Sequence, residues 1–190
     1  MTELTVDVVE RFYAILAIAG IAAMVVIWGL RVLAIGSDPA LDAYAAITRV
    51  IEPRANLAGW IVAALATVGS LYFSEVARFT PCTLCWYQRI AMYPFVVLLG
   101  VASLRRHERP PTGASTLAAV GALLAGYHVA LEWVPSLDTG ACSVAVPCTF
   151  VWFRVFGIVS LPTLALTAFL LILTLTLVRD PDEPRPWSDR

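Results

Sequence analysis

Five long apolar stretches constrain the fold of this chain more than any other feature of its sequence. Each is long enough to cross the hydrocarbon core of a bilayer, which takes about 20 helical residues. The chain is 59% hydrophobic and only 14% charged, which is too little polar surface for a water-soluble domain of its size. We therefore predict an all-α membrane protein with one helix in each of the stretches 12–35, 57–77, 86–104, 114–134 and 150–178.

The first stretch has the hydrophobicity of a secretory signal peptide, but its flank argues for a retained helix. Signal peptides begin with positive charge and have a shorter apolar core, whereas residues 1–11 carry net negative charge. The segment that follows is more polar. Asp38 and Pro39 favour a helix start there, and five residues then recur at helical spacing: Leu41, Tyr44, Ile47, Thr48 and Ile51. We expect either a short amphipathic helix on the inner membrane face or an ordinary linker.

Arginine residues predict the orientation, because loops on the cytoplasmic side of a membrane are enriched in basic residues. All basic charge is arginine, and most of it lies in segments 49–54, 105–109 and 179–190. We assign these segments to the cytoplasm, and residues 78–85 and the loop 135–149 to the outer face. The tail 179–190 contains three prolines and is expected to be disordered. The net charge of −1 gives no reason to expect a nucleic-acid partner.

The four cysteines of the chain form two pairs, and this orientation places both on the outer face, where disulfides can persist. Cys82 and Cys85 stand at the start of the third span. Thr80 can cap that helix, and Pro81 suits its first position. Cys82 then lies in the first turn, where the helix dipole favours an anion and lowers the pKa of a thiol. This pattern indicates redox chemistry at the membrane edge.

Two residues share the stripe of Cys82 further along the same helix. Trp86 and Arg89 are the fourth and seventh residues after Cys82. An unpaired charge at the depth of Arg89 is costly. Arg89 therefore either holds the Cys85 thiolate or the polar edge of a bound ligand, or it extends outward to lipid headgroups.

The second pair, Cys142 and Cys148, encloses only five residues. A disulfide that closes so short a loop removes little chain entropy, which argues against a purely structural role. Four cysteines allow three pairings. We expect the bonds 82–85 and 142–148 at rest, with a transient bridge between the pairs during turnover. His128, near the outer end of the fourth span, is either a functional group close to Cys85 or a packed histidine bonded to a carbonyl.

These residues together carry a resemblance to a known family. The run 81–94, Pro-Cys-Thr-Leu-Cys-Trp-Tyr-Gln-Arg-Ile-Ala-Met-Tyr-Pro, resembles the helix-start motif of the DsbB/BdbC disulfide-forming membrane proteins. The cysteine loop 142–148 and the apolar segment after it are similar to the second cysteine loop and last helix of that family. His128 matches a family histidine. The resemblance covers roughly residues 57–178 and is closest to the BdbC branch.

The resemblance implies a DsbB-like four-helix transmembrane bundle over residues 57–178, preceded by an extra transmembrane helix and an amphipathic segment in residues 1–56. The family binds a quinone, either ubiquinone or menaquinone, beside its Cys-x-x-Cys pair. Arg89 and His128 would contact this quinone, and Trp86 is a third candidate. No residue is assigned to a metal.

The resemblance also implies an order of electron transfer. Cys142 would form a mixed disulfide with a DsbA-like thioredoxin-fold thiol oxidase, and Cys148 would complete that pair. Cys82 and Cys85 would then pass the electrons to the quinone, with Cys85 next to it. The chain would be a multi-pass protein of the bacterial inner membrane, with both cysteine pairs on the extracytoplasmic side.

Three departures and two alternatives accompany this interpretation. Residues 1–56 add a span to the family core, the 142–148 loop is short, and Gln88 stands where many relatives carry glutamate. A vitamin K epoxide reductase-like enzyme is one alternative, although its loop cysteines usually precede its Cys-x-x-Cys pair. A membrane scaffold with two structural disulfides or a four-cysteine zinc site is the other.

Overall fold

The fold is all-α, as the apolar stretches predict. We describe it from a computed structural model, over residues 3–107, 109–140, 142–143 and 145–178. The backbone of this part forms six α-helices, three short helical turns and a single isolated β-bridge between Val155 and Val159. The α-helices are α1 (Glu3–Leu33), α2 (Asp38–Ile51), α3 (Ala55–Leu71), α4 (Thr83–Leu104), α5 (Ala114–Trp133) and α6 (Leu161–Leu177).

Among the described residues, four helical segments are long and apolar enough to span a membrane, as a multi-pass membrane protein requires. They are Leu4–Leu33, Asp38–Val76, Thr83–Leu104 and Ala114–Trp133. The second is continuous because a 3₁₀ turn at Glu52–Arg54 joins α2 to α3 and a π turn, η2 (Tyr72–Val76), extends α3. The first apolar stretch forms a single long helix, as expected.

The last predicted span begins later than the sequence pattern suggests. The prediction of a helix from residue 150 is wrong, because α6 starts at Leu161. Phe156 and Gly157 have positive φ, which interrupts the helical conformation. Pro162 then occupies the first turn of α6, a position that proline favours. The apolar residues before Leu161 therefore form a loop on the cysteine side of the bundle.

Helices α3 to α6 pack into a bundle around a core of alanines and a few large side chains. Small residues form one face of α5, at Ala114, Ala118, Gly121, Ala122 and Ala125. This face lets α6 approach closely, as in other membrane bundles. The fully buried ring of Phe169 lies directly over Gly121, where a Cβ atom would overlap it. Phe95, Leu99 and Ile172 fill the rest of the core.

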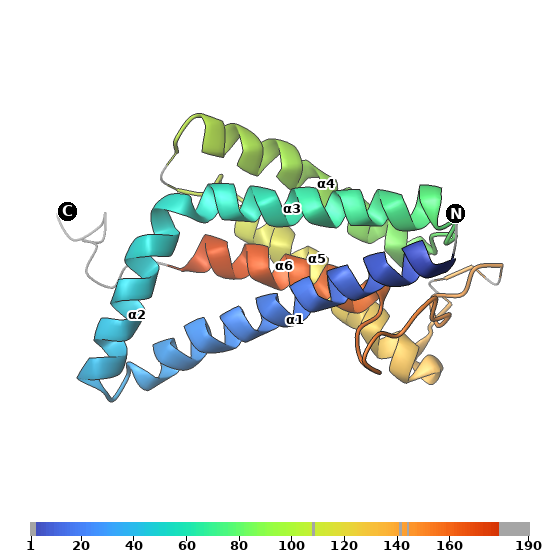
Figure 1. Ribbon diagram of the computed structural model, residues 1–190, viewed down its shortest axis with the longest axis horizontal. Coiled ribbons are helices and arrows are strands. Elements are labelled where there is room, and N and C mark those ends of the chain that lie inside the picture. Colours follow the sequence, from blue (N-terminus) through green and yellow to red (C-terminus); the bar gives the residue numbers. More distant parts are fainter. Residues whose placement is uncertain (1–2, 108, 141, 144, 179–190) are drawn as a thin grey trace.

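Helices α1 and α2 lie outside this bundle (Figure 1). Figure 1 shows α1 crossing α6 and approaching α3 near the N-terminus, while α2 joins the diverging ends of α1 and α3. The predicted helix at Asp38 is confirmed, although Ser37 rather than Asp38 is its N-cap residue. Tyr44 and Thr48 of the predicted stripe are buried, and the guanidinium of Arg31 donates to the Tyr44 hydroxyl over 3.2 Å. The location of α2 on the inner membrane face stays a prediction, and the predicted tail 179–190 lies outside the described residues.

Candidate active site

The Cys82–Cys85 pair lies at the N-terminus of α4, close to its predicted place. The predicted cap at Thr80 and the placement of Pro81 in the helix are wrong, because the helix begins at Thr83 and Cys82 itself is the N-cap residue. Its sulfur accepts the backbone N–H of Cys85 over 3.3 Å, in the manner of a capping side chain. The two thiols are free, with sulfurs 2.9 Å apart, so the expected resting disulfide is not formed in this structure.

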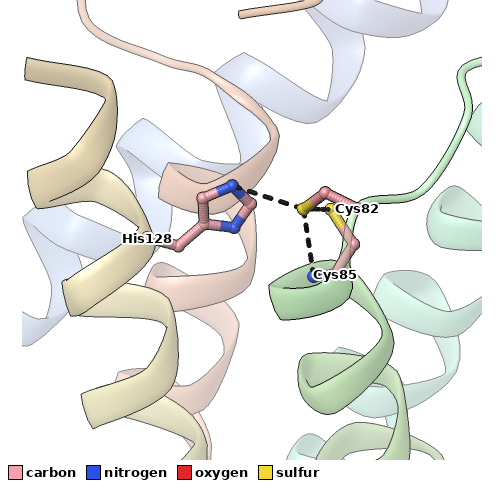
Figure 2. Close-up of side chains that lie close together, drawn as sticks. All are labelled: Cys82, Cys85 and His128. Carbon is pink, nitrogen blue, oxygen red and sulfur yellow. Dashed lines mark hydrogen bonds between the residues drawn. The ribbon is translucent and has the colours of Figure 1, made fainter. Parts of the chain in front are cut away.

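His128 of α5 lies beside this pair, as Figure 2 shows. Its ring is buried, and its Nε2 is 3.7 Å from the Cys82 sulfur. On the other edge of the ring, Nδ1 is 3.0 Å from the amide nitrogen of Gln88. An amide nitrogen only donates hydrogen bonds, so Nδ1 accepts and Nε2 carries the proton. His128 therefore donates from Nε2 to Cys82.

These donors make Cys82 acidic. Cys82 precedes the first residue of the membrane-spanning segment Thr83–Leu104. The hydrogen bond from the Cys85 thiol, followed by that from His128, lowers the pKa of Cys82 to about 4 and outweighs the opposing effect of burial. Cys82 is consequently a thiolate at neutral pH, which is the form that exchanges with disulfides.

The second cysteine pair lies against the first. Cys142 and Cys148 form a disulfide with a Cα–Cα distance of 5.8 Å, as predicted. Cys148 is 1% exposed and belongs to one buried cluster with Cys82 and Leu131, whereas Cys142 lies at the partly exposed edge of that cluster. The fold thus brings all four cysteines together, with Cys142 the more accessible sulfur of its pair.

A cavity of about 260 Å³ lies on another side of Cys85, between α1, α3, α4 and α6. Its lining is mostly apolar and includes Phe73, Met92 and Phe169. A small polar group gathers around Cys85, formed by Ser70, Gln88 and Arg89. An apolar cavity with a few converging polar groups is the usual form of a site for a small, mainly hydrophobic ligand.

Arg89 lines this cavity and is hydrogen-bonded to Ser70. Its Nε donates to the Ser70 hydroxyl over 2.9 Å, and a terminal nitrogen donates to the Ser70 carbonyl over 3.0 Å. The guanidinium also lies over the ring of Trp86, 5.2 Å from its centroid. Trp86 itself is half exposed and, like His128, is not among the cavity-lining residues. Of the three predicted quinone contacts, Arg89 alone lines the cavity.

Sequence reasoning missed three residues that shape the site. Gln88 stands out in the sequence only as a departure from relatives, yet it orients His128 and lines the cavity. A buried amide in an apolar span is a signal that could have identified it. Ser70 and Tyr13 also line the cavity, but their sequence positions give no comparable signal, because their roles depend on contacts between helices.

The donor atoms also limit what metal the site could hold. Atoms of Cys82, Cys85 and His128 lie within 4.8 Å of one another, a set that suits a soft metal ion. The alternative of a four-cysteine zinc site is wrong, because the sulfurs of Cys142 and Cys148 are bonded to each other.

Comparison with known proteins places this geometry in a family. The model of the family described as disulfide bond formation protein DsbB matches residues 52–179. A probable disulfide formation protein C of Bacillus cereus is 43% identical over 122 residues, which are 64% of this chain and 88% of the relative. Disulfide bond formation protein C of Bacillus subtilis is 43% identical over 117 residues, 61% of this chain and 85% of the relative. No solved structure matches.

A free dithiol and a disulfide in one cluster at the end of a helical membrane bundle define a membrane disulfide oxidoreductase. The chain belongs to the DsbB family of disulfide bond formation proteins. The resemblance seen in the sequence is thereby confirmed, and the family assignment favours it over the vitamin K epoxide reductase-like and scaffold alternatives.

Proposed function

We propose that this protein reoxidises a DsbA-like thioredoxin-fold thiol oxidase outside the cytoplasm and passes the electrons to a membrane quinone. One observation carries the proposal. Cys82 belongs to the buried cluster that contains the Cys142–Cys148 disulfide, whereas its partner Cys85 lines the apolar cavity with Arg89. The two thiols of one helix turn thus connect a disulfide to a site for a lipid-soluble acceptor.

The first exchange takes place at the accessible disulfide. A thiolate of the reduced partner attacks Cys142, and Cys148 leaves as a thiolate. The second partner thiolate then attacks the partner's own sulfur in this mixed disulfide, which releases Cys142 and the oxidised partner. One disulfide has been transferred, and two electrons remain on Cys142 and Cys148.

The second exchange moves these electrons within the protein, starting from the form in which Cys82 and Cys85 are bonded. Cys148 attacks Cys82, and Cys85 leaves toward the cavity. Cys142 then attacks Cys148, which restores the 142–148 disulfide and releases Cys82. A thiol with a low pKa is a good leaving group, and Cys82 has this property.

The last step returns the helix pair to its disulfide form. Oxidation of Cys82 and Cys85 releases two electrons and two protons, which convert one quinone to a quinol. A guanidinium in an apolar cavity can donate a hydrogen bond to a quinone oxygen and stabilise the charge that develops there. Ser70 holds Arg89 in the position to do so. Direct contacts of His128 or Trp86 with the quinone, and the choice between ubiquinone and menaquinone, stay predictions.

Reconstitution tests the proposal directly. The purified protein is mixed with a short-chain quinone and a reduced thioredoxin-fold thiol oxidase, and quinol formation is followed by absorbance. Wild-type protein should form one quinol per disulfide made, and Cys85→Ser should abolish this reaction while leaving the protein in the membrane. Thr83→Ser, a conservative change between the two cysteines, should retain the rate. Absence of quinone reduction by the wild type would refute the function.

The proposed orientation has its own test. The arginine-rich segments predict that all four cysteines face away from the cytoplasm. In sealed right-side-out vesicles treated with reductant, a membrane-impermeant maleimide should label Cys142. Labelling only after the vesicles are opened would contradict the orientation.

A further inference from the structure

Helix α1 lies outside the region that matches the family model, which begins at residue 52, yet it forms part of the cavity beside Cys85. Tyr13, Leu16 and Ala17 of α1 line that cavity together with residues of α3, α4 and α6. We propose that α1 forms one wall of the quinone site and sets how tightly the quinone is bound. This inference rests on the function proposed above.

Helix α1 presents a narrow inward stripe and is otherwise exposed. Ala14, Ala17 and Ile27 are buried along this stripe, whereas Ile15 and Ile18 on the remaining surface are 58% and 41% exposed. In a membrane protein the exposed apolar side chains face lipid. The inward residues around the cavity are therefore the ones that separate its interior from the bilayer on this side.

Tyr13 fixes this wall to α3. Its hydroxyl donates to the backbone carbonyl of Leu65 over 3.1 Å. Its ring lies over Gly69, where a Cβ atom would be only 2.6 Å from the ring. The same ring is 5.9 Å from that of Phe73, which also lines the cavity. The glycine thus provides the space that lets α1 approach α3 at this level.

Two further contacts fix α1 to α6. A Cβ on Gly20 would lie 2.7 Å from Leu171, so the two helices touch closely there. Further along, the indole nitrogen of Trp28 donates to the Thr174 hydroxyl over 3.1 Å. Leu16 and Ala17 lie between the Tyr13 and Gly20 contacts, so their positions relative to the cavity are well defined.

The chemistry of the lining matches a quinone rather than a polar ligand. Arg89 and Cys85 offer a cation and a sulfur on α4, whereas Leu16 and Ala17 offer an apolar surface on α1. A ligand with polar ring oxygens and an apolar body satisfies both. A change of one or two carbon atoms in an apolar site alters binding by roughly tenfold or more, so the α1 side chains can discriminate among ring substituents and tails.

Two substitutions on neighbouring residues test the wall. Ala17→Phe projects into the cavity and should raise the KM for quinone about tenfold or more, with the KM for the thiol oxidase unchanged. Ile18→Phe, on the lipid-facing side of the same helix, should change neither. If wild-type protein reduces quinone and both variants match it, the wall is refuted and the proposed function stands. If the wild type reduces no quinone, the proposed function and the role of α1 are both refuted.

A second measurement uses the unaltered protein and so does not depend on the folding of Ala17→Phe. A quinone with a photoreactive azido group is cross-linked to the wild type, and the labelled peptides are identified by mass spectrometry. Label within residues 13–17 would support the proposal. Label confined to α3, α4 and α6 would overturn it.

Discussion

Replacing His128 with alanine should make Cys82 less acidic. His128 donates from Nε2 to the Cys82 sulfur, and this hydrogen bond favours the thiolate over the thiol. When the donor is removed, the thiolate loses a stabilising partner while the thiol loses little. The pKa of Cys82 must then rise from its value of about 4.

The geometry sets the size of this rise. Hydrogen bonds to charged groups contribute about 1.5–3 kcal/mol, and one pKa unit corresponds to about 1.4 kcal/mol. The contact is long at 3.7 Å, which favours the lower end of that range. We expect a rise of about one unit, since the Cys85 thiol, the larger contributor, remains in place. The pH window that reveals the change is therefore about 3.5 to 6, because Cys82 is a thiolate in both proteins at neutral pH.

The assay follows alkylation by iodoacetamide against pH in a protein whose loop cysteines, Cys142 and Cys148, are replaced by serine. Peptide mass spectrometry separates modification of Cys82 from that of its neighbour. The inflection of the Cys82 rate should move to higher pH in His128→Ala. His107→Ala, which changes the only other histidine of the chain, should leave it in place. Coincident curves for both variants would show that His128 does not stabilise the thiolate.

Three further outcomes are expected. Arg89→Ala should raise the KM for quinone more than that for the thiol oxidase, because its guanidinium lines the cavity; equal effects on both would count against a quinone contact. In Cys148→Ala, Cys142 is left as a free thiol that should attack the disulfide of the oxidised partner, whose second sulfur leaves as a thiolate, and the resulting Cys142-linked complex should appear on a non-reducing gel; a complex linked through another cysteine would contradict the order of exchange. Gly121→Ala, which forces a Cβ against Phe169, should lower the free energy of unfolding in detergent by about 1–3 kcal/mol. Gly126→Ala, whose Cβ would meet no neighbouring atom within 4 Å, serves as its control.

Much of the fold follows from local sequence. Bilayer thickness sets the length of a spanning helix, so apolar length alone predicts α1, α3, α4 and α5. Local chemistry also predicts α2, whose start is marked by proline at position 39. Hydropathy does not predict the start of α6, because the loop before Leu161 is itself largely apolar, and the boundary is marked by Gly157 and Pro162 instead.

The site was predictable only in part. The spacing of Cys82 and Cys85 on one helical turn predicts their contact, although the disulfide expected between them is not formed. The expected pairing of Cys142 with Cys148 is confirmed. The contact of His128 with Gln88 depends on the axial register between α4 and α5. That register is set by the packing of the bundle core, which a single sequence does not reveal. The contribution of α1 to the cavity depends on packing between helices in the same way.

The burial of Cys148 in the cluster that holds Cys82 has a kinetic consequence. Because donor and acceptor sulfurs already share one compartment, the internal exchange of the proposed function would require local rearrangement of side chains rather than travel of a long loop. Under that proposal, turnover should be limited by how often the two diffusing reactants arrive, one from the aqueous phase and the other from within the bilayer.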